Sequence, residues 1–209
     1  MSTAGAYVFP DRCLSLVTSN LGKIERETFK NSLGDWLADP AVELWFCDES
    51  GIEGGPRPRH RWVKKGSRPE VPYAGSHLRR NVIGAVCPGS GELSCLIFTH
   101  CDTVIFQEFL NNLAKEAPAK NGARQLLAMD NASWHKAKAL DFHHFEPVYL
   151  PPYSPDFNPI ERFWLLLKRD FFSDYFTRDG NELEERIIKG LRSFFDRQAI
   201  VASQCAISV

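Results

Sequence analysis

The chain has 209 residues, of which 44% are hydrophobic and 24% are charged, and its net charge at neutral pH is −1. These values are ordinary for a globular domain and argue against disorder, and the length suits one sizeable domain or one domain with an extension. The sequence has neither an apolar stretch of the roughly 20 residues that a membrane helix needs nor the basic flank and apolar core of a signal peptide. Six cysteines are scattered without a Cys-x-x-Cys pair, which indicates reduced thiols in a cytoplasmic compartment.

The first half of the chain is expected to form one helix and then three strands. Residues 1–40 are an N-terminal helical lead-in, in which apolar side chains of 22–39 recur at partial helical spacing. Residues 42–47 are rich in β-forming side chains and are expected to end as a strand at the turn signal 48–51. Residues 81–98 hold two apolar runs on either side of Pro-Gly-Ser-Gly, which predicts a hairpin.

The second half of the chain is expected to alternate helices with short strands. Segments in which apolar side chains follow helical spacing are expected to be helices, and short apolar runs are expected to be strands. Asp102 or Thr103 could cap the first helix of this half. The expected strands are 124–129 and 147–150, and the expected helices are 103–116, 133–140, one that starts near Ile160, and 181–195. This order predicts an α/β fold with a mixed five-stranded sheet flanked by helices.

Positive charge is concentrated in one segment of the chain. Residues 57–80 contain eight Lys or Arg against a single acid, a net charge of +7, while the rest of the chain sums to −8. Such a block is a candidate surface for a phosphate backbone, with Arg59, Arg61, Lys64 and Lys65 as expected contacts that do not read sequence. A solvated basic loop without a partner is the alternative interpretation.

Three carboxylates occur where predicted elements begin or end. Asp48 follows the first strand, Asp130 follows the strand 124–129, and Glu161 lies in the first turn of a later helix. Open α/β sheets place ligands at the edge where the chain leaves the strands. If these side chains converge to about 5 Å, each pair repels by about 3 kcal/mol at an effective dielectric near 20, so a cation is expected between them. Oxygen ligands select Mg²⁺ or Mn²⁺, and two such ions on shared carboxylates serve in-line phosphoryl displacement.

Each of these side chains also has a structural alternative. Either aspartate alone suits a turn, and Asn158, Pro159 and Glu161 fit a helix capping box. The segment LPPYSPDFNPIERFW (150–164) nevertheless contains four prolines before the carboxylate. Because fixed φ angles reduce the entropy lost in ordering a loop, these prolines favour a role for the loop in positioning Glu161.

Two further polar residues lie close to the aspartates in the sequence. Glu49 is adjacent to Asp48 but faces the opposite side of the sheet if the strand continues. We therefore leave it outside the triad. His135 follows Asn131 by four residues and could contact DNA or orient a carboxylate, while a plain surface histidine is the alternative.

The motifs CDES, MDNASWH and LPPYSPDFNPIERFW, in this order, closely resemble the DDE transposases of the mariner superfamily, in the branch found in bacterial insertion sequences. The resemblance spans about residues 42–195, and the last motif is highly specific. It implies an RNase H-like fold and a DDE triad carried by Asp48, Asp130 and Glu161, with two Mg²⁺ or Mn²⁺ ions. It also implies cleavage at transposon ends and joining of a 3′-hydroxyl to target DNA, usually at TA, by a nucleoid-associated bacterial protein.

The resemblance also sets expectations for domains and partners. We expect a lead-in (1–40), an RNase H-like catalytic domain (41–200) and a C-terminal tail (201–209). Members of the family carry an N-terminal helix-turn-helix region that reads the transposon ends, and forty residues with one clear helix cannot supply a pair of such modules. A separate chain could supply this reader, and two copies of the chain could pair on double-stranded DNA.

One departure from the family pattern leaves other functions open. Thirty residues separate Asp130 from Glu161, a few fewer than the family usually shows, which predicts a trimmed helix near 134–142. The alternatives are another RNase H-like nuclease, for example one that cuts RNA–DNA hybrids, and a degenerate transposase fragment that only binds DNA.

Overall fold

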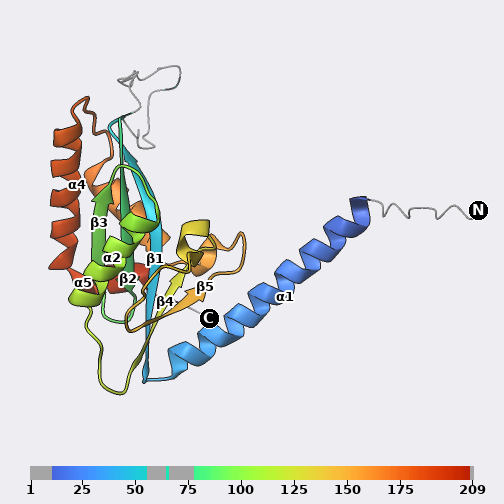
Figure 1. Ribbon diagram of the computed structural model, residues 1–209. Coiled ribbons are helices and arrows are strands. Elements are labelled where there is room, and N and C mark those ends of the chain that lie inside the picture. The colour runs from blue at the N-terminus through green and yellow to red at the C-terminus, as the bar shows by residue number, and fades with distance from the viewer. Residues whose placement is uncertain (1–10, 56–64, 66–77, 208–209) are drawn as a thin grey trace, which may run out of the picture.

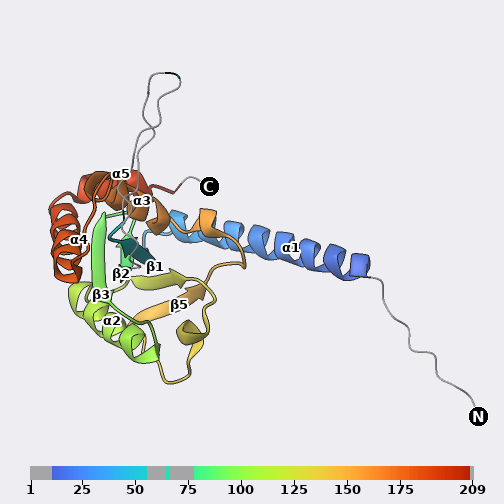
Figure 2. The same ribbon diagram turned by 90° about the horizontal axis from the view of Figure 1, so that it is seen from above.

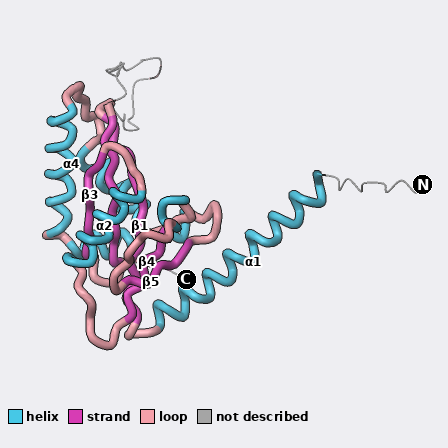
Figure 3. Tube along the Cα trace, viewed as in Figure 1, coloured by secondary structure: helices cyan, strands magenta, loops and turns pink. Residues whose placement is uncertain are grey.

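The computed structural model describes residues 11–55, 65 and 78–207, with side chains described from residue 22 onward. Figures 1 and 3 show its helices and strands. Two short 3₁₀ turns, η1 and η2, interrupt the second half of the chain. The elements are α1 (Asp11–Ala38), β1 (Val42–Glu53), β2 (Arg79–Cys87), β3 (Glu92–Phe98), α2 (Thr103–Glu116), β4 (Arg124–Met129), η1 (Ser133–Lys136), β5 (Phe145–Tyr149), η2 (Pro155–Phe157), α3 (Ile160–Phe171), α4 (Gly180–Phe195) and α5 (Gln198–Cys205).

The five strands form one mixed sheet in the order β3-β2-β1-β4-β5. The β2–β3 hairpin and the β1–β2 pair are antiparallel, whereas β1, β4 and β5 run parallel to one another. A helix or a long loop precedes β4 and β5, as parallel neighbours require. The expected α/β class and the mixed five-stranded sheet flanked by helices are therefore confirmed.

Both faces of the sheet are covered by helices, and alternate side chains of β1 pack into the two cores between the sheet and these helices. Trp45 and Cys47 belong to the core under α2, while Leu44 and Phe46 belong to the core under α3 and α4. Seen from above, α2 lies on one side of the sheet and α3 and α5 on the other, and α1 extends away from the domain (Figure 2). In β1 the even-numbered side chains thus face α3, which determines where Asp48 points.

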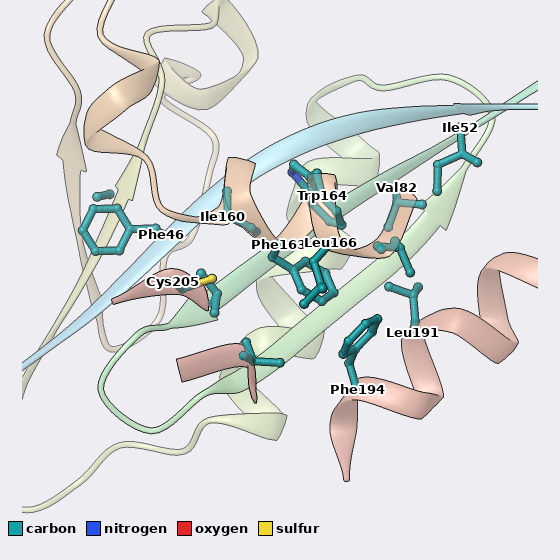
Figure 4. Packing of buried hydrophobic residues seen from close by; sticks show 14 of the residues in the cluster. Phe46, Ile52, Val82, Ile160, Phe163, Trp164, Leu166, Leu191, Phe194 and Cys205 are labelled. Atoms are coloured by element: carbon teal, nitrogen blue, oxygen red, sulfur yellow. The ribbon is translucent and has the colours of Figure 1, made fainter. Parts of the chain in front are cut away.

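The core on the α3 side is built from large aromatic and aliphatic side chains. Figure 4 shows Phe163 of α3 near Phe194 of α4, and Trp164 of α3 over the strands. The rings of Phe163 and Phe194 meet edge to face with their centroids 5.4 Å apart. The helical stripe expected after Ile160 is thus the buried face of α3, since Ile160 and Phe163 are fully buried.

The end predicted for the first strand is wrong. The local sequence 48–51 indicates a turn, but β1 continues to Glu53 because β2 pairs with it from Phe46 to Glu53. This antiparallel partner satisfies the backbone groups that a turn would otherwise leave exposed. Asp48 therefore lies within β1 rather than at its end.

Other boundaries also differ from expectation; the strand expected at 147–150, for example, is Phe145–Tyr149. The N-terminal helix is longer than expected and begins at Asp11. In the described ranges, no helix combines the length and apolarity needed to cross a bilayer. The helix expected over 133–140 is a single turn, Ser133–Lys136, which agrees with the trimming predicted near 134–142. Residues 201–205 of the expected tail 201–209 belong to α5, which packs on the domain.

The helix α5 is expected to contribute to stability, because Val201 and Cys205 are fully buried in the α3-side core. Val201→Ala removes two methyl groups and leaves a cavity, so it should lower the free energy of unfolding by about 2 kcal/mol. Urea unfolding measures this change. Ser203→Ala is the control on the same helix, because Ser203 is exposed and should change the free energy by less than about 0.5 kcal/mol. Equal effects of the two substitutions would contradict the packing of α5.

Candidate active site

Strand register places Asp48 and Asp130 side by side. The parallel pairing of β1 with β4 reaches Phe46 opposite Ala128, and each aspartate lies two residues beyond its member of this pair. Because side chains alternate with a period of two, both aspartates face the α3 side of the sheet. The chain leaves β4 after Met129 while β1 continues with β2, so the two aspartates flank the point where the sheet opens.

The loop before α3 brings Glu161 to the same place. Asn158 is buried and donates from its side-chain amide to the carbonyl of Cys47, 3.0 Å away, which ties the loop to β1 next to Asp48. The backbone N–H of Asn158, which a capping box would pair with Glu161, donates to the carbonyl of Pro155 instead. The Glu161 side chain is exposed, and among the described residues no hydrogen bond joins its carboxylate to the start of α3.

The three carboxylates line one open pocket of about 390 Å³. Most of the remaining wall is the proline segment that precedes α3. Tyr153 on its rim is fully exposed and has a positive φ of 55°, a backbone conformation that non-glycine residues rarely adopt and that occurs at binding sites. The other lining residues are Asn131, Leu150, Pro151, Pro152, Ser154, Pro155 and Asn158.

A second contact holds this proline segment from the side of α1. Arg26 donates to the hydroxyl of Ser154 at 2.6 Å and forms an ion pair with Asp156 at 2.7 Å. Its guanidinium also lies 4.9 Å from the centre of the Phe157 ring. The wall of the pocket is therefore fixed both by β1, through Asn158, and by α1.

The electrostatics of Asp48 reflect the convergence of acids. Burial, and then the negative charges of Glu161, Glu49 and Asp130, raise the pKa of Asp48 to about 7. No cationic side chain of the described residues is among the main causes of this shift. The pocket therefore concentrates negative charge that a bound cation would neutralise.

The donor set of the pocket fits hard divalent cations, since it is made of carboxylates. Within the described part of the chain, no group of three or more His, Cys, Asp or Glu side chains is arranged to hold one metal ion. The oxygen donors of the pocket are of the type that Mg²⁺ and Mn²⁺ prefer, and the expected pair of ions stays a prediction.

His135 is fully buried and lies between two carboxylates. Its Nδ1 is 2.8 Å from Oδ1 of Asp130, and its Nε2 is 3.1 Å from Oε1 of Glu49. Burial lowers the pKa of His135, but these hydrogen bonds outweigh burial and raise it to about 9. The same hydrogen bond lowers the pKa of Asp130. The expected contact of His135 with DNA is wrong, because the side chain has no exposed surface. Orientation of a carboxylate is the interpretation that its contacts fit.

Glu49 is the polar residue that the sequence did not assign to the site. It faces away from Asp48, as a continued strand requires, and its Oε1 also accepts a hydrogen bond from Nε1 of Trp134 at 3.3 Å. The sequence indicates a role for Glu49 only through its position next to Asp48. Its partner His135 lies 86 residues later in the chain. Spacing along the chain could not reveal that contact.

Most of the basic segment lies outside the described residues, including Arg59, Arg61 and Lys64. Lys65 is described and exposed. At the end of the segment, Arg80 pairs with Glu184 at 3.4 Å, so this cation is used within the fold. The expected phosphate contacts of the segment stay a prediction.

Comparison with protein families and relatives gives a consistent result. The family model described as DDE superfamily endonuclease matches residues 43–184. The uncharacterized protein y4pE/y4sA of Sinorhizobium fredii is 32% identical over 105 residues, which are 49% of this chain and 75% of that protein. The uncharacterized 39 kDa protein of insertion element IS630 from Shigella sonnei is 26% identical over 129 residues, which are 59% of this chain and 37% of that protein.

Solved structures of the Mos1 transposase are similar to the whole described fold. The paired-end complex with the left transposon end has a TM-score of 0.61 at 12% identity and covers 98% of this chain and 66% of that chain. The mariner Mos1 paired-end complex with Mg has a TM-score of 0.61 at 15% identity and covers 100% of this chain and 68% of that chain. The fold is therefore RNase H-like, as expected. The family match over residues 43–184 shows that the chain belongs to the DDE superfamily endonucleases.

Proposed function

We propose that this chain cleaves DNA at the ends of an insertion element and joins the resulting 3′-hydroxyl to target DNA, in a reaction that depends on two divalent ions. The observation that carries the proposal is one pocket lined by Asp48, Asp130 and Glu161, which come from three separate segments of the chain. The raised pKa of Asp48 supports it, because the pocket needs positive charge. Mos1 has been solved with Mg and with Mn, which agrees with this choice of metal.

The three carboxylates would share the two ions. Asp48 would contribute to both sites, Asp130 would complete one and Glu161 the other. When bound, such ions activate the attacking water or 3′-hydroxyl and stabilise the leaving oxygen in an in-line displacement. The protein's own contribution is to hold these side chains in place, through the strand register and through the bond from Asn158 to β1.

DNA would bind along the basic segment. Arg59, Arg61, Lys64 and Lys65 would contact phosphates without reading sequence, so sequence specificity would come from other contacts. The family resemblance supports TA as the target, a pair of chains on DNA, and a helix-turn-helix region that reads the transposon ends. The chain spans 37% of the IS630 protein that it matches.

Glu161→Gln provides the direct test of the metal-dependent reaction. We expect the unaltered chain to nick supercoiled plasmid with Mg²⁺ or Mn²⁺ and to stop when EDTA is added, and the variant to show no metal-dependent nicking, because one ion would lose a charged ligand. Gel analysis of nicked plasmid measures this. Glu185→Gln is the matched control, since Glu185 is an exposed helical glutamate outside the pocket.

Three outcomes would contradict the proposal. Metal-dependent nicking by Glu161→Gln at the level of the unaltered chain would exclude Glu161 as a ligand. Faster cutting of an RNA–DNA hybrid than of duplex DNA would assign the pocket to a different RNase H-like nuclease. The absence of saturable Mn²⁺ binding in calorimetry would instead support a fragment that only binds DNA.

A further inference from the structure

The buried histidine beside Asp130 carries an inference that rests on the proposed function and deepens it. We propose that Glu49 and His135 are positioning residues, which fix the Asp130 carboxylate so that one of its oxygens is presented to a divalent cation. Neither residue would touch the ion or the DNA. They form a chain of contacts that runs from β1, through η1, to the end of β4.

The two oxygens of Asp130 have different surroundings. Oδ1 accepts from Nδ1 of His135 at 2.8 Å and from the backbone N–H of Ala132 at 2.9 Å. Among the described residues, no donor reaches Oδ2, and 56% of the Asp130 side chain is exposed. One oxygen is therefore held by the protein, and the other is left for a ligand in the pocket.

The imidazole ring of His135 is held on all sides. Its Nε2 is bound by Glu49, and its ring centre lies 4.4 Å from that of Phe106. Its backbone is fixed as well, because the hydroxyl of Tyr149 donates to the His135 carbonyl at 3.0 Å. Because the ring has no room to rotate, its hydrogen bond to Oδ1 also restricts the orientation of the Asp130 carboxylate.

Glu49 anchors this arrangement rather than serving as a metal ligand. Its Oε1 accepts from both His135 and Trp134, and it lies on the face of β1 opposite Asp48. Removing its charge would leave the ring of His135 without its ionic partner. The expected consequence is a looser Asp130, not the loss of a ligand.

Fixing the carboxylate matters because a metal ligand must be held to within about 0.5 Å, and an exposed side chain loses rotamer freedom when it binds an ion. Groups that orient metal ligands in this way typically change metal affinity by about 10–100-fold when they are removed. The proposal therefore predicts a change in metal affinity that can be measured without DNA and without catalysis.

Calorimetric titration with Mn²⁺ tests the proposal on the full chain. His135→Ala and His135→Gln should weaken Mn²⁺ binding by about 10–100-fold, because neither provides a donor where Nδ1 lies. His135→Asn should recover much of the affinity, since its amide nitrogen can take the place of Nδ1. Glu49→Gln should weaken binding less than His135→Ala, because the glutamine oxygen can still accept from Nε2.

His144→Ala is the matched control. His144 also makes one ring hydrogen bond, to the carbonyl of Ala117 at 2.9 Å, and also packs on an aromatic ring, that of Phe145. It does not contact Asp130. We expect His144→Ala to lower the unfolding midpoint in urea while leaving Mn²⁺ affinity unchanged.

The outcomes separate this inference from the proposed function. Unchanged Mn²⁺ affinity in both His135→Ala and Glu49→Gln, with only a lower unfolding midpoint, would make the histidine purely structural and overturn the inference. Equal affinities of His135→Asn and His135→Gln would also overturn it. If His135→Ala does not fold, the comparison of the asparagine and glutamine variants decides. Loss of Mn²⁺ binding in Asp130→Asn with no effect of either positioning residue would leave the proposed function standing and refute the inference alone.

Discussion

Replacing Asp48 with asparagine should abolish metal-dependent DNA cleavage and, at the same time, stabilise the metal-free protein at pH 8. Asp48 would be shared by both ions, so its charge contributes to each of them. A metal ion contributes several kcal/mol of transition-state stabilisation, and each 1.36 kcal/mol is a factor of ten in rate. The cleavage rate should therefore fall by about 10³-fold or more.

The gain in stability follows from the raised pKa of Asp48. The folded protein holds this proton with a pKa of about 7, against an ordinary value of 3.8, so between these values the folded state binds more protons than the unfolded chain. The free energy of unfolding therefore falls as the pH rises through this window, and the loss is complete above pH 7. The asparagine side chain of the variant carries no charge and avoids the loss, which should amount to about 2–4 kcal/mol at pH 8.

Urea unfolding at pH 8 and at pH 4, with EDTA present, measures this difference. The advantage of Asp48→Asn should be largest at pH 8 and nearly absent at pH 4. Asp35→Asn is the control for net charge, because Asp35 is exposed on α1 and away from the pocket. A variant no more stable than the parent chain at pH 8 would argue against the raised pKa of Asp48. Added Mg²⁺ should stabilise the parent chain and have little effect on the variant.

Gly84→Ala is expected to destabilise the protein by about 3 kcal/mol, at the upper end of the cost of overpacking. Gly84 lies opposite Asp48 in the β1–β2 register. A β-carbon there would stand 2.8 Å from Cη2 of Trp164 and 3.1 Å from Sγ of Cys95. Trp164 is buried and belongs to α3, three residues after Glu161. The substitution should therefore displace the start of α3 and lower both the free energy of unfolding and the rate of nicking.

A second substitution and a control make this prediction specific. Gly89→Ala is the control, because no atom lies within 4 Å of a β-carbon at Gly89, and its effect should be small or stabilising. In a Trp164→Phe background, the smaller ring leaves room, so Gly84→Ala should cost less there than in the parent chain. A double-mutant cycle in urea measures this coupling. Additive effects would mean that Trp164 does not limit the space above Gly84.

Local patterns predicted most of the elements. The helix from Thr103 to Glu116 and the strand from Arg124 to Met129 agree residue for residue with expectation, because their apolar spacing and flanking residues act over short distances. Asp102 caps the helix through a bond from the N–H of Ile105 at 2.9 Å. The short α5 has no side-chain cap and only eight residues, so its packing could not be read from its sequence.

The candidate site was predicted only in part, for a related reason. The recognisable motifs pointed to Asp48, Asp130 and Glu161, and these residues line one pocket. The predicted strand ends too early because the turn-like sequence 48–51 carries no information about its pairing partner β2. The contact between Glu49 and His135 depends on the packing of distant segments, and neither residue type nor spacing indicates it.

The attachment of Arg26 to the proline segment couples the orientation of α1 to the shape of the pocket. Phe29 and Leu33 are buried in the core and anchor the C-terminal half of α1 on the domain. On the N-terminal side of Arg26, α1 has fifteen more residues. They form a helical segment about 22 Å long that extends away from the sheet (Figure 1). A partner that binds this N-terminal segment and changes the orientation of α1 would displace Ser154 and Asp156 through Arg26. The shape of the pocket next to Glu161 would change as a result.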